Sequence, residues 1–162
     1  MSQIADIVGD GFIKVYAVLT IANIAAPTVA ELNAGLKLQD KITKDGLIGF
    51  RPETADVDTT ALDSDFDTVL GGRAGFSGMM LRLKKQDGTD TIYNTLIRRY
   101  RFYCVIRRSS DESAVWAIGN KVAVHPVECG LHAWVDPEPN MLERYEVPLK
   151  PYLEPNVDAV VA

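Results

Sequence analysis

The sequence has few of the residues on which enzymes and metal-binding proteins depend. Only two histidines and two cysteines occur among its 162 residues. Cys104 and Cys129 are too few for a disulfide framework and have no close metal-binding spacing, so we expect buried free thiols. Nucleophile-elbow and zinc-protease motifs do not occur, and Gly71-Gly72-Arg73 lacks the lysine and hydroxyl of a phosphate loop. The sequence therefore predicts a protein that is not an enzyme and uses no cofactor.

The sequence also lacks a long hydrophobic run and a surplus of positive charge. The longest apolar run, residues 15–26, is interrupted by Thr20 and Asn23 and is shorter than a membrane span. No basic segment with a cleavage site precedes this run, so we expect no signal peptide, no membrane association and a cytosolic protein. The net charge is -5 and the isoelectric point is near 5.0, which argues against a wide nucleic-acid-binding surface.

The chain has the length of one domain, residues 1–162, and its pattern predicts a mainly β fold. Hydrophobic residues make up 47% and charged residues 24%, close to the average of globular proteins. Turn signals separate short strands, so we expect a β-sandwich or a small barrel with a helix packed on it. A hairpin is predicted within residues 38–50, and Pro126 is expected at a sheet edge or a bulge. Further strands are expected at residues 12–21, 79–84, 100–107, 114–118, 121–129 and 144–149.

Two short helices are predicted. Thr28 and Glu31 have the spacing of a capping box, which indicates a helix at about residues 28–34. Gly35 can end this helix in the left-handed conformation. The second helix is predicted at about residues 90–98, because apolar residues recur there at helical spacing after an aspartate that can cap the helix start. It should lie on the sheet.

Residues 51–75 differ from the rest of the chain, because acidic residues and threonines alternate there with isolated apolar residues. Such a stretch predicts a long, weakly buried hairpin or loop that does something other than fill a core. Three alternating aspartates, Asp63, Asp65 and Asp67, resemble the start of a calcium-binding loop, but Thr68 and Ala74 stand where that loop needs glycine and glutamate. A solvated acidic face is therefore favoured. Its candidate carboxylates are Glu53, Asp56, Asp58, Asp63, Asp65 and Asp67.

A zinc site is a second possibility that the pattern does not favour. His125, Cys129 and His132 could supply three ligands, and Cys104 could supply the fourth from a neighbouring strand. On a strand, however, His125 and Cys129 share a face that His132 does not share. We therefore expect structural roles for these residues and no bound metal.

Five arginines surround the strand expected at residues 100–107 and interleave with aromatic residues, which is typical of surfaces that stack on nucleic acid. The periodicity opposes that function, because Tyr100 and Phe102 should face inward while the arginines lie at a helix end, on the opposite face and at a hairpin. Structural and subunit-interface roles are therefore favoured. The candidate interface residues are Arg98, Arg99, Arg101, Arg107 and Arg108.

Two stretches carry a specific resemblance to a known family. The first is IANIAAPTVAELNAG at residues 21–35, which follows Lys14-Val15-Tyr16, and the second is VWAIGNKVAVHPVECG at residues 115–130. Together with the ending VDAVVA, they resemble the major tail proteins of long-tailed phages that infect actinobacteria. In that family a cassette like APTVAELNAG follows the first strand, and a W-x-x-G-x-K-V-x-V-x-P-V stretch follows a strand hairpin.

This resemblance implies a tail tube subunit with a β-sandwich-like or barrel-like domain and a flanking helix. Six copies are expected to close into a ring through an inner β-barrel, and rings to stack into a hollow tube through which phage DNA passes without specific binding. The tube of type VI secretion systems shares this architecture. The implied partners are further copies of the chain, the tape measure protein, the tail terminator and distal tail proteins. The implied locations are the virion tail and, during assembly, the host cytoplasm.

In such a tube the carboxylates within residues 51–75 would face the lumen, where they repel DNA, or the next ring. We expect residues 51–75 to make contacts between rings, and loosely structured N- and C-terminal segments to become ordered only between neighbouring copies. Two alternatives come from other classes. One is a small ligand-binding β-barrel with an apolar cavity, and the other is an acidic enzyme in which two carboxylates converge in a cleft.

Overall fold

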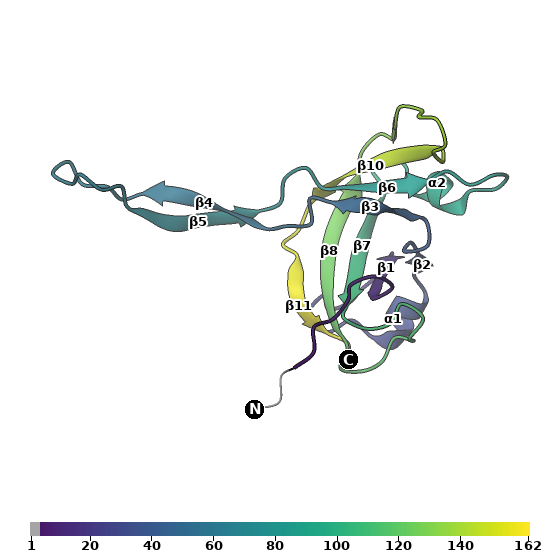
Figure 1. The fold of residues 1–162 in the computed structure, drawn as a ribbon. Helices are drawn as coiled ribbons and strands as arrows, with labels where there is room; N and C mark the ends of the chain where they lie inside the picture. The colour runs from purple at the N-terminus through teal and green to yellow at the C-terminus, as the bar shows by residue number, and fades with distance from the viewer. Residues whose placement is uncertain (1–3) are drawn as a thin grey trace.

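The computed structural model describes residues 4–162, which form antiparallel strands and two short helices (Figure 1). The helices are α1 (Val29–Asn33) and α2 (Thr91–Thr95). The strands are β1 (Ile13–Val18), β2 (Leu36–Lys37), β3 (Ile42–Ile48), β4 (Glu53–Asp58), β5 (Val69–Gly75), β6 (Met80–Lys84), β7 (Arg101–Arg108), β8 (Lys121–Cys129), β9 (Ala133–Trp134), β10 (Arg144–Pro151) and β11 (Asn156–Val160).

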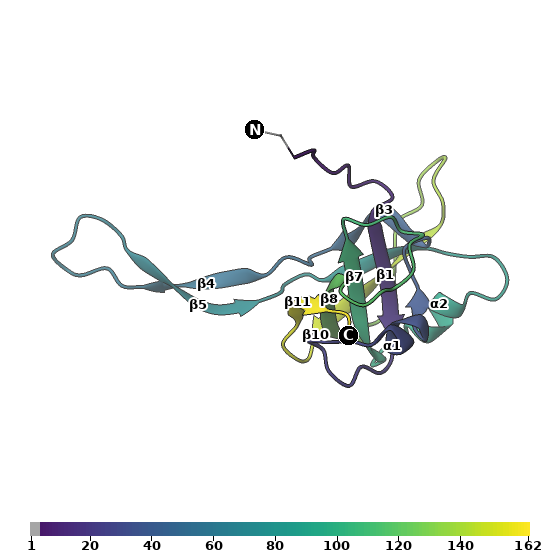
Figure 2. The same cartoon turned by 90° about the horizontal axis from the view of Figure 1, so that it is seen from below.

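Most strands belong to one curled sheet, which confirms the prediction of a mainly β fold with a barrel-like form. The strand order is β2-β1-β7-β8-β10-β6-β3, while β11 pairs with β8 and β9 pairs with β10. The first part of β10 pairs with β6, and its last three residues pair with β8. Because one strand is shared in this way, the sheet turns a corner at β10 and forms a half-barrel (Figure 2). The strands β4 and β5 pair only with each other.

Both faces of the central strand β7 are buried, although its alternating pattern predicts only one apolar face. Phe102, Cys104 and Ile106 point into the cluster inside the curl, which also holds Tyr145. Val105 points to a second cluster on the outer face of the sheet, where α1, Trp116 and the C-terminal residues cover it. The sequence pattern does not show this cover because the covering residues come from distant parts of the chain.

The predicted capping box is present at the start of α1. The Thr28 hydroxyl accepts the Glu31 N–H at 3.3 Å, and the Glu31 carboxylate accepts the Thr28 N–H at 2.9 Å. The same carboxylate accepts the Ala22 N–H at 3.1 Å, which fixes the chain between β1 and α1. Gly35 does not have the predicted left-handed conformation. A glycine is needed at this position because a Cβ on residue 35 would lie 2.8 Å from a methyl of Val18.

The second predicted helix is shorter than expected. The Asp90 side chain caps α2 by accepting the Tyr93 N–H at 3.1 Å, as predicted. The helix then ends at Thr95, because Leu96 has a ψ of 60° and leaves the helical region. Ile97, expected on the buried face, is therefore 54% exposed.

The hairpin predicted within residues 38–50 is wrong. Residues 44–46 lie inside the single strand β3, whose pairing with β6 shifts register between Ile42 and Leu47. This bulge brings Gly46 against the backbone of β6, where a Cβ would lie only 2.4 Å from the Arg82 carbonyl oxygen. The Lys-Asp-Gly signal therefore marks a bulge and a close approach of two backbones.

Two predictions around β8 have different outcomes. The strand predicted at residues 114–118 is wrong, since this segment is a loop without regular secondary structure. Pro126 lies where β8 changes partner, because β11 pairs with β8 up to Val124 and β10 pairs with it from Val127. The proline is thus at a local sheet edge, as predicted, where no strand needs the N–H that proline lacks.

The C-terminal segment is not loose, which corrects the prediction that it becomes ordered only between copies. It forms β11 on the edge of β8, and Ala159 and Val161 are each 1% exposed. The Val161 N–H donates to the Asn120 carbonyl, and the Ala162 N–H donates to the Pro27 carbonyl, both at 2.9 Å. Within residues 4–162, no helix is long and apolar enough to cross a bilayer.

Candidate assembly surface

A long hairpin projects from one side of the body and touches little else (Figures 1 and 2). It consists of β4, β5 and the loop between them, and we call residues 51–75 the arm. Every residue of both strands is exposed. The predicted weakly buried hairpin is therefore confirmed. A two-stranded hairpin without a packed face is marginally stable in water, so this arm needs a covering surface to hold it rigid.

The two faces of the arm differ in their side chains, since one carries Val57 and Leu70 and the other carries Asp56, Asp58 and Val69. Val57 lies opposite Leu70 in the ladder, and residues directly opposite each other share a face. Asp56 and Asp58 alternate with Val57 and therefore point the other way. The exposed fractions of Val57 and Leu70 are 49% and 64%. An amphipathic element with its apolar face in water is a candidate for protein contact.

The arm tip has a defined shape and exposed apolar side chains. The hydroxyls of Thr59 and Thr68 lie 2.9 Å apart across the strands, and Ser64 bonds to both backbone groups of Phe66. Leu62 and Phe66 are nevertheless 106% and 73% exposed. The tip thus presents two large apolar side chains to solvent.

Two phenylalanines anchor the base of the arm on a buried histidine. Phe50 precedes β4 and Phe76 follows β5, and both rings meet the His125 ring edge to face, with centroids 5.2 and 5.3 Å away. His125 comes from β8 and is 2% exposed. Burial lowers its pKa to about 4, and the positive charge of Arg108 adds to the shift. The neutral imidazole therefore belongs to the folded state.

Acidification is expected to destabilise the subunit through His125. Its pKa is about 4 in the folded chain against an ordinary value of 6.5, so the unfolded chain takes up the proton first as the pH falls. The contribution of neutral His125 to the free energy of unfolding is complete above pH 6.5 and is lost as the pH falls to about 4. The total loss is about 3 kcal/mol. Urea unfolding at pH 7, 5.5 and 4 should show a shallower pH dependence for His125→Leu than for the natural chain. Equal slopes for both proteins would contradict the assignment.

All six predicted carboxylates lie on the exposed arm, and none takes part in an ion pair within residues 4–162. Glu53 accepts the Ser77 hydroxyl at 3.2 Å, and Asp58 accepts the Thr60 N–H at 2.9 Å. The Thr60 bonds lower the pKa of Asp58. Asp56, Asp63, Asp65 and Asp67 form neither an ion pair nor a side-chain hydrogen bond that the structure shows in residues 4–162.

The five predicted arginines separate into different environments. Arg98 and Arg99 are exposed in the turn after α2, and Arg108 is exposed at the end of β7. Arg101 binds the Glu128 carboxylate at 2.8 Å and lies over the Tyr152 ring at 4.7 Å. Arg107 is 2% exposed. The prediction that Arg107 is an interface residue is therefore wrong, because its own chain encloses its guanidinium.

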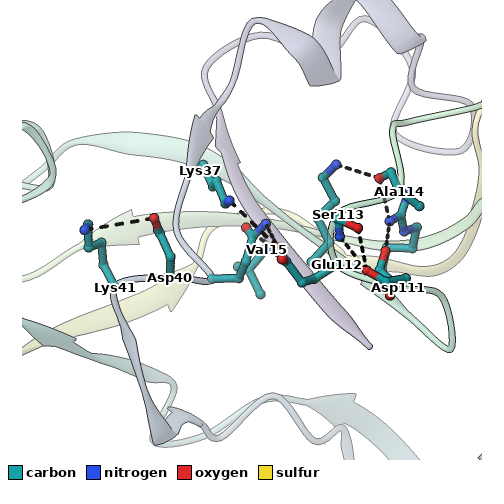
Figure 3. Close-up of polar contacts among 11 residues, drawn as sticks. Val15, Lys37, Asp40, Lys41, Asp111, Glu112, Ser113 and Ala114 are labelled. Carbon is teal, nitrogen blue, oxygen red and sulfur yellow. Dashed lines mark hydrogen bonds and ion pairs between the residues drawn. The ribbon is translucent and has the colours of Figure 1, made fainter. Parts of the chain in front are cut away.

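Arg107 and Lys14 hold the loop that includes residues 114–118, which the sequence pattern predicts to form a strand. Both cations donate to the Ala114 carbonyl at 2.9 Å, and both lie over the Trp116 ring, at 5.1 and 4.9 Å. Figure 3 shows the Asp111, Ser113 and Ala114 contacts of this loop, next to the ion pair of Lys37 with Glu112. Burial lowers the pKa of both cations. Backbone carbonyls and an indole face thus take the place of a carboxylate partner.

Within the part of the chain described, the four candidate zinc ligands do not form one site. Within residues 4–162, no three of the residues His, Cys, Asp and Glu lie together as metal ligands. His132 stacks on Tyr93 and bonds to the Leu96 carbonyl, away from His125. The cluster around Phe102 and Tyr145 occupies the centre of the curled sheet, and a cavity remains beside it, lined by Ile13, Val15 and Leu47 among others.

The half-barrel and the uncovered arm define a mainly β fold with a long exposed hairpin. A sequence profile of the phage tail tube protein family matches residues 1–162. The chain belongs to this family. A chain in the cryo-EM structure of the anti-feeding prophage (AFP) baseplate, 6-fold symmetrised, has the same fold, with a TM-score of 0.56 and 11% sequence identity. The alignment covers 96% of both chains. No curated protein matches the sequence significantly.

Proposed function

We propose that six copies of this chain close into a ring and that the rings stack into the tail tube of a long-tailed phage that infects actinobacteria. The family supports a structural role in the tail. The half-barrel supports ring formation, because its strand order ends at β2 and β3 and leaves edges that a neighbouring copy can pair. A head-to-tail contact closes into a ring when the rotation between copies allows it.

The observation that carries this proposal is the arm. Its apolar face and tip, with Val57, Leu62, Phe66 and Leu70, lie in water in a lone subunit. A neighbouring copy in the same or the next ring would cover them and make the arm rigid. The arm carboxylates add negative charge, which repels DNA phosphates over about 8 Å at physiological salt. Such repulsion lets DNA pass without binding.

The remaining parts of the proposal follow from this role. The subunit acts by assembly and not by catalysis. Its partners are further copies of itself, the tape measure protein, the tail terminator and the distal tail proteins. It is made in the host cytoplasm and resides in the virion tail. The exposed N-terminal residues from Ile4 onward, of which Ile4 is 92% exposed, become ordered between neighbouring copies.

Size-exclusion chromatography with negative-stain microscopy tests the proposal directly. The purified chain should give rings or tubes, with the assembled fraction rising with concentration. A small globular particle at every concentration would contradict the proposed function and favour a protein that acts alone.

A further inference from the structure

A turn with two free arginines follows α2. Residues 97–100, which we call the arginine turn, are closed by the Tyr100 N–H donating to the Ile97 carbonyl at 3.0 Å. The Arg99 N–H donates to the Cys129 carbonyl at 2.9 Å and ties the turn to β8. Arg98 and Arg99 are exposed. In residues 4–162 their guanidinium groups take part in no ion pair or hydrogen bond, although Arg101 next to them binds Glu128.

The backbone of Arg99 is strained. Its φ of 70° lies in the left-handed region, which glycine adopts freely and a residue with a Cβ adopts only at a free-energy cost. A glycine would make this turn with less strain. An arginine that stands there in spite of the strain indicates that its side chain has a task that the isolated subunit does not show.

The arm carries the opposite charge on the opposite side of the body. Its six carboxylates outnumber its two cations, Arg51 and Arg73. The helix α2, which leads into the arginine turn, and the arm lie across the body from each other in both views (Figures 1 and 2). Within one copy they do not meet. A contact between them therefore joins two copies in a head-to-tail manner.

We propose that the arginine turn is the docking surface for the arm tip of a second copy. The guanidinium groups of Arg98 and Arg99 bind the tip carboxylates, which a planar fork of donors suits better than a single ammonium would. Ile97, 54% exposed, lies beside them to contact the apolar side chains of the tip. This inference rests on the proposed function, because it names which surface of the next copy receives the arm. The tip residues concerned are Leu62, Asp63, Asp65, Phe66 and Asp67.

A charge exchange between two variants tests the docking. The arm variant is D63K/D65K/D67K and the turn variant is R98E/R99E. Each variant alone places like charges in contact and should raise the concentration needed for assembly by about tenfold or more. In an equal mixture each arm meets a turn of opposite charge, so assembly should return to within about threefold of the natural chain. K121E/K150E, which reverses two exposed lysines outside the arm, the arginine turn and the edge strands β2 and β3, is the control and should assemble normally.

A glycine substitution separates the docking function from folding. R99G removes the strain and one docking group, so its melting temperature should equal or exceed that of the natural chain while its assembly is weakened by about threefold to tenfold. A structural role for Arg99 would instead lower the melting temperature.

Sedimentation velocity and negative-stain microscopy measure the assembly of each variant and of the mixture. Normal tubes from the arm variant or the turn variant, or a mixture that assembles no better than either variant, would overturn the docking and leave the tube function intact. A natural chain that never forms tubes, together with a mixture that still associates, would overturn the tube function and leave the docking intact.

Discussion

Deleting residues 51–75 is expected to leave a folded subunit that no longer forms tubes. The arm strands pair only with each other, and their residues are all exposed, so the body loses no packing. The cut ends already lie together, because Ile48 pairs with Met80 and a Cβ on Gly49 would lie 2.5 Å from the Gly78 carbonyl oxygen. The melting temperature should therefore change by about 3 °C or less. Circular dichroism measures the folding, and negative-stain microscopy measures the assembly.

Mixing provides the control for this deletion. The shortened subunit keeps the arginine turn and every sheet edge, so it can still receive an arm but cannot extend one. A small proportion of it should shorten the tubes formed by the natural chain. Tubes of normal length made from the shortened subunit alone would show that the arm does not join copies. A shortened subunit that fails to fold would show that the arm belongs to the folding unit.

Replacing Arg107 by methionine is expected to destabilise the subunit by about 3 kcal/mol or more. The guanidinium donates to the carbonyls of Asp111, Ala114 and Val115 and to the Asn120 side chain, at 2.9 to 3.3 Å. Methionine fills a similar space but leaves the partly buried carbonyls of Asp111 and Val115 without this donor, each at about 1–3 kcal/mol before relaxation. The Ala114 carbonyl keeps its bond from Lys14, and the Asn120 side chain keeps its bond from the Ala117 N–H. Urea unfolding at pH 7 measures the loss.

Arg108 offers a matched control for Arg107. It is the next residue on β7 and is exposed, so Arg108→Met should change the free energy of unfolding by about 0.5 kcal/mol or less. Arg107→Lys should rescue little of the loss, because an ammonium cannot reach four acceptors in the plane that the guanidinium provides. An Arg107→Met subunit as stable as the natural chain would contradict the structural role of this cation.

Local signals made the correct parts of the fold predictable from sequence. The capping box depends on two residues three positions apart, and both hydrogen bonds are found. The alternation of Met79, Leu81 and Leu83 predicts a strand with one buried face, and these side chains are 2% exposed or less. The arm was recognisable because its apolar residues are too few and too isolated to fill a core.

The errors have a common physical cause, which is contact between distant segments. The Lys44-Asp45-Gly46 signal is a turn signal when considered alone, but the backbone of β6 turns it into a bulge. The C-terminal tail has no strong strand pattern, yet it forms β11 because β8 offers a free edge. Arg107 was assigned to an exposed interface because a single sequence does not reveal the loop that folds over it.

The sequence indicated which residues are candidates for assembly contacts but not where the fold places them. The acidic residues and the arginines were both singled out, but nothing in their spacing says that the arm and α2, which leads to Arg98 and Arg99, lie on opposite sides of the body. The contacts of Phe50 and Phe76 with His125 were not predicted either. The available signal was that Phe50 and Phe76 flank residues 51–75 symmetrically, which is where a hairpin meets the domain that carries it.

Amide hydrogen exchange of the arm tests the central claim most directly. In a lone subunit the arm ladder is open to solvent on both faces and should exchange quickly. In assembled tubes the account predicts that exchange over residues 53–75 slows by about tenfold or more, together with that of the arginine turn. Exchange of the arm that is as fast in the tube as in the lone subunit would contradict the claim that a second copy covers it.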